Sequence, residues 1–118
     1  MKPTEEQIKE LWRWCGFGMD GVGIWHCPDG IREYGAMPKP TLDNLFKWAV
    51  PKVQEINNEI LVRFMFGSVN RAGVYQWTKR YSRKKNFEWL ELGAASDKDP
   101  ALALFWAIWK VIHERTND

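Results

Sequence analysis

The sequence predicts a single α+β domain, an α-β-α sandwich in which helices cover both faces of an antiparallel sheet. Its 118 residues suit one compact domain. Three segments have the capping residues and apolar content of helices, and residues 60–92 alternate in the manner of strands. We expect the order helix, β-hairpin, helix, three-stranded antiparallel meander, helix, with flexible termini at residues 1–3 and 114–118.

The first helix is predicted to begin after Thr4. Thr4 and Gln7 have the spacing of a capping box, in which each side chain bonds the backbone of the other. Gly16 suits the position just after the helix, where a left-handed backbone is common. The apolar residues expected on one face are Ile8, Leu11, Trp12 and Cys15.

A short hairpin is predicted over residues 22–34, with arms at 24–26 and 31–34. The stretch "CPDG" between the arms has the residues of a type I turn. The preceding "GFGMDGVG" follows a helix, whereas a phosphate-binding loop follows a strand and opens a helix. We therefore interpret it as a flexible connection, and "GAMPKP" as a linker.

The second helix is predicted to begin after Thr41, a good N-cap residue. Pro51 leaves two readings open. In one, a proline on the outer side bends a continuous helix around the core. In the other, the helix stops near Ala49 and restarts at Pro51. The residues expected on its buried stripe are Leu42, Leu45, Phe46, Ala49, Val53 and Ile56.

Three strands are predicted in "EILVRFMFG", "GVYQWTKRY" and "FEWLEL". The first has a wholly apolar face, formed by Ile60, Val62, Phe64 and Phe66. The links between the strands are short, so neighbouring strands are expected to run antiparallel.

The last helix is predicted to begin with Asp99 as N-cap and Pro100 as its first residue. From 101 to 112 every residue except Lys110 is apolar, so the helix must be covered on all sides. The sheet and two helices can cover it. A second subunit can replace the helices, with Trp106 and Trp109 as the interface, or a foreign partner can cover an exposed patch.

Four stretches together resemble a known family: "LWRWCGF", "WHCPDG", "TLDNLFKWAVPKV" and "DPALALFWAIWKVI". They resemble the phage ABA sandwich domain family of small phage and prophage proteins. The resemblance spans Leu11 to Ile112. It implies an α-β-α sandwich and a phage or prophage origin, and it carries over no catalytic residue.

No catalytic, metal or cofactor motif is evident in the sequence. Cys15, His26, Cys27 and His113 match no zinc-site spacing, and two cysteines do not make a disulfide scaffold. The polar N-terminus lacks the apolar region of a signal peptide. The longest apolar run is shorter than a membrane span of about 20 residues. We expect a cytoplasmic protein of a bacterial host, without membrane contact.

Basic charge is concentrated in the predicted sheet. Residues 60–87 hold seven basic and no acidic residues, although the whole chain has a net charge of only +2. Phosphate backbones bind basic side chains, and bases stack on aromatic ones. A solvated hairpin tip, which is the simplest explanation, or an acidic protein partner would also explain the charge. Within the basic region 63–85, the nucleic-acid hypothesis rests on Lys79, Arg80, Tyr81, Arg83, Lys84 and Lys85.

These observations favour a protein that acts by binding. We expect an accessory protein without enzymatic activity, whose partner is a phage or host protein or a second copy in a homodimer. The alternative is a nucleic-acid-binding module that uses the basic region.

Overall fold

The computed structural model of the chain describes residues 1–28, 33–56, 59–79 and 87–116. Its elements are α1 (Glu5–Trp14), β1 (Gly18–Met19), β2 (Trp25–His26), β3 (Glu33–Gly35), α2 (Leu42–Asn44), the π-helix η1 (Leu45–Ala49), α3 (Val50–Gln54), β4 (Ile60–Met65), β5 (Asn70–Lys79), β6 (Phe87–Asp97) and α4 (Pro100–Thr116). The predicted α+β class is therefore confirmed.

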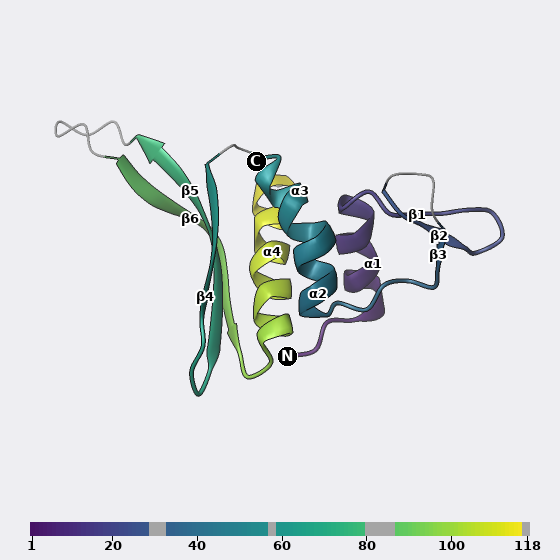
Figure 1. The fold of residues 1–118 in the computed structure, drawn as a ribbon, viewed down its shortest axis with the longest axis horizontal. Helices are drawn as coiled ribbons and strands as arrows, with labels where there is room; N and C mark the ends of the chain where they lie inside the picture. Colours follow the sequence, from purple (N-terminus) through teal and green to yellow (C-terminus); the bar gives the residue numbers. More distant parts are fainter. Residues whose placement is uncertain (29–32, 57–58, 80–86, 117–118) are drawn as a thin grey trace.

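The described strands form two antiparallel sheets at opposite ends of the molecule (Figure 1). The large sheet has the order β4-β5-β6, and the small one has the order β1-β2-β3. The predicted meander is thus confirmed. The stretch interpreted as a flexible connection contains β1, because Gly18 and Met19 pair with His26 and Trp25.

The layers follow a different order from the predicted α-β-α sandwich, which the family resemblance also implies. All the helices lie on one side of the large sheet (Figure 1). Helix α4 lies against β5 and β6, and α2, η1 and α1 pack on its other sides. The second face of the large sheet is therefore not covered by a helix of the described chain.

Helix α4 is the centre of the core. Ala103, Leu104, Phe105, Ala107 and Ile108 are all fully buried. The sheet on one side and the other helices on the remaining sides cover it, as the first of the three readings predicts. An apolar helix with no polar stripe requires this position.

The predicted helix starts are confirmed. The Thr4 hydroxyl accepts a hydrogen bond from the Gln7 N–H, and the Gln7 side chain accepts from the Thr4 N–H. Thr41 caps α2 through the Asn44 N–H. Asp99 accepts a hydrogen bond from the Ala101 N–H at 2.9 Å, which caps α4. These bonds satisfy N–H groups that lack partners within a helix.

The second helix continues through Pro51, but only with a widened turn before it. Residues Leu45–Ala49 form a π-helix, and the Val50 N–H bonds to the Leu45 carbonyl. Pro51 has no N–H and its ring crowds the carbonyl four residues back, so a wide turn accommodates it. The extra residue changes which side chains face the core. Phe46, predicted to be buried, is 46% exposed.

Small residues form the face of β5 and β6 that packs on α4. Ala72, Val74 and Ala95 are buried there, and a Cβ atom on Gly93 would lie 2.5 Å from the Ala107 carbonyl oxygen. The aromatic residues of β5 therefore occupy the opposite face. The Tyr75 ring lies over Gly73, because a Cβ atom on Gly73 would come within 2.8 Å of it. Trp77 lies on the same face as Tyr75, since side chains alternate along a strand.

Candidate protein-interaction surface

The two edges of the large sheet differ. Strand β4 pairs with β5 in unbroken register, and no other strand among the described residues pairs with its second edge. Strand β6 has a register shift opposite Val74 and Tyr75, which leaves Leu92 as an extra residue. The Lys110 ammonium also donates a hydrogen bond of 2.7 Å to the Ala94 carbonyl on β6. Among the described residues, nothing comparable protects the β4 edge.

The hydrogen-bond pattern shows which backbone groups of β4 face outward. The Trp77 N–H donates to the Glu59 carbonyl at 2.9 Å. In an antiparallel ladder the N–H and C=O of one residue point to the same side, and the side alternates along the strand. Leu61 and Arg63 therefore bond β5. The residues that direct their N–H and C=O groups to the open edge are Ile60, Val62 and Phe64.

Exposed apolar side chains surround this edge. We call Phe46, Leu61, Met65 and Phe66 the β4 surface. Phe66 is 73% exposed and Met65 54% exposed. The Phe64 ring connects Phe46 with Phe66. It stacks on the Phe66 ring with a centroid distance of 5.5 Å, and its centroid lies 5.8 Å from that of Phe46. The three rings are thus contiguous on the helical side of the edge, and Leu61 and Met65 lie on its other side. Exposed apolar side chains beside an open strand edge are typical of an interaction site.

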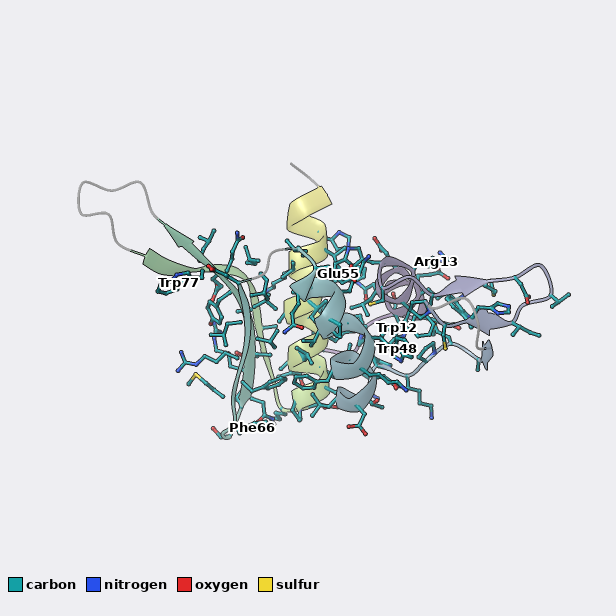
Figure 2. All side chains as sticks on the ribbon, turned by 45° about the horizontal axis from the view of Figure 1, so that its top comes forward. Trp12, Arg13, Trp48, Glu55, Phe66 and Trp77 are labelled. Atoms are coloured by element: carbon teal, nitrogen blue, oxygen red, sulfur yellow. The ribbon has the colours of Figure 1, made fainter. Side chains whose placement is uncertain are left out.

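The outer face of the large sheet continues the β4 surface. Leu61 is opposite Tyr75, and Met65 is opposite Arg71. The Arg71 guanidinium lies 3.5 Å from the Glu91 carboxylate on β6. Figure 2 shows Phe66 and Trp77 towards opposite ends of this sheet, whereas Trp12 and Trp48 lie on the helical side.

The basic residues proposed for nucleic-acid binding lie mostly outside the described residues. Lys79 ends β5, whereas Arg80, Tyr81, Arg83, Lys84 and Lys85 fall in the segment that is not described. The strands that lead to this segment are described. β4 pairs with β5 only as far as Gln76, whereas β5 and β6 continue as a two-stranded ribbon to Lys79 and Phe87.

Trp106 and Trp109 make contacts within the chain. The Trp106 indole N–H donates to the Met1 carbonyl at 2.8 Å. The Trp109 ring stacks on Phe105, and its centroid lies 4.2 Å from that of the tilted His113 ring. Both line a cavity of about 280 Å³ beside α4, which is slightly smaller than the usual range of about 300–1,000 Å³ for ligand pockets. The interface hypothesis for these two residues stays a prediction.

The cysteine and histidine residues have structural contacts. Burial raises the pKa of the Cys15 thiol to about 12, so it is protonated near pH 7 and a poor nucleophile. The His26 Nε2 atom lies 2.7 Å from the Asp20 carboxylate. This hydrogen bond, and a second one from the Ile24 N–H, lower the pKa of Asp20. Among the described residues, no group of three or more histidine, cysteine, aspartate or glutamate side chains could hold a metal ion.

Comparison of the chain with protein-family models, curated proteins and solved structures found no match. The phage ABA sandwich resemblance therefore stays a prediction. In the described part of the chain, no helix combines the length and the apolar character needed to cross a membrane.

Sequence reasoning missed the β4 surface. The spacing of an α-helix predicts Phe46 on the buried stripe, and the π-helix breaks that spacing. Phe66 comes directly after the end of β4, beyond the part of the strand that packs on the core. One signal was available in the sequence. Leu61 and Met65 place apolar side chains on the second face of β4, and a sheet covered on one side would leave them exposed.

Proposed function

We propose that the protein acts by binding another protein through the β4 surface, as an accessory protein rather than an enzyme. The observation that supports this most is the edge of β4, with which no described strand pairs, together with the exposed apolar side chains beside it. Strand addition at such an edge uses main-chain hydrogen bonds for affinity and neighbouring side chains for specificity.

The family resemblance supplies the biological setting of the proposal. The protein would serve a phage or prophage in the cytoplasm of the bacterial host, and its partner would be a phage protein, a host protein or a second copy.

A comparison of variants in a cross-linking capture experiment tests this function. The test variant is Phe46→Ser combined with Phe66→Ser, which removes two exposed rings from the β4 surface. The control is Met19→Ser combined with Val22→Ser, which removes exposed apolar side chains at the small sheet. A captured protein, whether another chain or a second copy, should be lost with the test variant and kept with the control.

Equal capture by the test variant and the control would contradict the proposal, provided that both fold as the wild type does by circular dichroism. Failure of the wild type to bind any protein, including itself, would contradict it as well.

A second candidate function, nucleic-acid binding, is favoured by the ribbon of β5 and β6 that extends past β4. This ribbon leads to the basic residues 79–85. The major groove of DNA admits a two-stranded β-ribbon, and phosphate contacts by lysine and arginine dominate affinity.

Fluorescence anisotropy with labelled single- and double-stranded DNA and RNA tests the second function at two salt concentrations. The comparison variant carries Arg80, Arg83, Lys84 and Lys85 changed to serine. Binding that weakens with salt and disappears in the variant would support this function, because each neutralised phosphate adds to the salt dependence. Absence of binding at low salt would reject it.

A further inference from the structure

We propose that the partner at the β4 surface is a second copy of this chain, joined through its own β4 in an antiparallel pair centred on Leu61. This inference rests on the proposed function and names its partner. The two large sheets would then form one continuous sheet of six strands across a two-fold axis perpendicular to the sheet.

The backbone of β4 restricts the register of such a pair. Ile60 and Val62 direct their N–H and C=O groups to the open edge, since the odd-numbered neighbours bond β5. Ile60 of one copy must therefore exchange hydrogen bonds with an even-numbered residue of the other copy. A slip of one residue would bring opposite sheet faces together and would mismatch the bonding groups.

Charge selects one register among those that remain. Residues directly opposite each other on one face have Cβ atoms about 4.5–5.5 Å apart, so their charges interact. With Leu61 opposite Leu61, Glu59 of each copy lies opposite Arg63 of the other. With Val62 on the axis, Arg63 faces an apolar leucine. With Arg63 on the axis, two like charges oppose each other, which is unfavourable.

The side chains around β4 suit the same pairing. Glu59, Leu61, Arg63 and Met65 are all exposed. Leu61 would be covered by its own copy on the axis. Phe46, on the helical side of the strand, would face the junction of the two helical layers. The β4 edge also lacks the lysine, proline or bulge that keeps a monomeric sheet edge from pairing.

Charge exchange tests the register, with sedimentation equilibrium as the measurement. We expect Arg63→Glu and Glu59→Arg each to raise the dimer dissociation constant about tenfold or more, because each change places like charges opposite one another. The double variant E59R/R63E restores opposite charges. It should return the dissociation constant to within about threefold of the wild type.

Cysteine substitution tests the position of the axis. In the proposed pair the two Leu61 Cα atoms lie about 4.5 Å apart, within the disulfide range of about 4.4–6.8 Å. Leu61→Cys should therefore form a covalent dimer under mild oxidation. Met65→Cys is the matched control, on the same strand and face but far from the axis, and should not. The native cysteines are both buried, so background cross-linking should be low.

Each outcome decides the proposal. Rescue in the charge exchange and selective cross-linking at Leu61→Cys would support it. A protein that stays monomeric at all concentrations would overturn it. A dimer whose dissociation constant does not change with Arg63→Glu would also overturn it, and so would a dimer that is cross-linked through Arg63→Cys. If the capture experiment still gave a foreign protein that depends on Phe46 and Phe66, the proposed function would survive this failure.

Discussion

The two edges of the large sheet carry the same kind of backbone groups in opposite situations. β6 is shielded, because α4 lies against it, Lys110 bonds its Ala94 carbonyl and a bulge interrupts its register. β4 is regular and bordered by exposed rings, and no described strand pairs with its second edge. An edge strand is prone to unwanted pairing unless it is shielded. The difference supports the proposal that the open edge serves binding, and four predictions test this contrast.

The largest effect is expected where β6 meets α4. In Gly93→Val the added Cβ would lie 2.5 Å from the Ala107 carbonyl oxygen. Because this oxygen belongs to the backbone of α4, it cannot move aside easily. Overpacking of this kind should lower the free energy of unfolding by about 3 kcal/mol, measured by chemical denaturation. In the control variant Gly67→Ala, near the end of β4, the added Cβ would lie 3.6 Å from the Val69 carbonyl oxygen, an ordinary contact. This variant should change the free energy of unfolding by less than about 0.5 kcal/mol. Equal losses would show that β6 is no more tightly packed than the β4 end.

The next effect separates the two sides of β4. Arg63→Pro removes an N–H that bonds β5, and should lower the free energy of unfolding by about 2–3 kcal/mol. Val62→Pro removes an N–H that faces the open edge. It should lower the free energy of unfolding by only about 1 kcal/mol, but it should still block strand addition. Thermal unfolding measures the stability of both variants, and their masses in solution report whether strand addition is blocked. A greater loss in Val62→Pro would show that the assigned hydrogen-bond alternation is wrong.

Removal of the shield on β6 should have a smaller effect. Lys110→Met keeps the length of the side chain but removes the donor to the Ala94 carbonyl. The expected loss is about 1 kcal/mol, the ordinary worth of one hydrogen bond. Because the β6 edge is then less protected, we also expect more self-association by light scattering. Unchanged stability and mass would indicate that Lys110 does not protect this edge.

The smallest effect is expected on the outer face of the sheet. Arg71→Ala removes the ion pair with Glu91, whose side chains are both about half exposed. Solvent-exposed pairs contribute little, so the free energy of unfolding should change by less than about 0.5 kcal/mol. A loss above about 1 kcal/mol in urea denaturation would mean that this face is more shielded from water than its exposure indicates.

The sequence predicted the helices of this fold better than the outer parts of its sheet. Thr4, Thr41 and Asp99 fix the starts of helices through local hydrogen bonds, and local rules suffice for them. The strands were predicted in the right order, but β5 begins earlier and β6 ends later than the aromatic residues suggested. Alanine and glycine carry little strand signal, yet they form the face that packs on α4.

The interaction surface could not be predicted, because it depends on long-range placement. Phe46 is exposed through a π-helix that accommodates Pro51, which the usual helical spacing does not anticipate. The open face of the sheet follows from the position of all helices on one side. The wholly apolar face of β4 indicates which face of the sheet the helices cover. No local pattern in residues 60–92 indicates that the other face stays uncovered.

The central position of α4 has a consequence for biosynthesis. This helix follows every other element in the chain and supplies much of the core that they share. When the residues up to Asp97 have left the ribosome, the complete large sheet has emerged, yet the helix on which that sheet packs has not. Both faces of the sheet and its β4 edge would then meet water, a state prone to aggregation during synthesis. The protein thus completes its core only after residues 100–116 leave the ribosome.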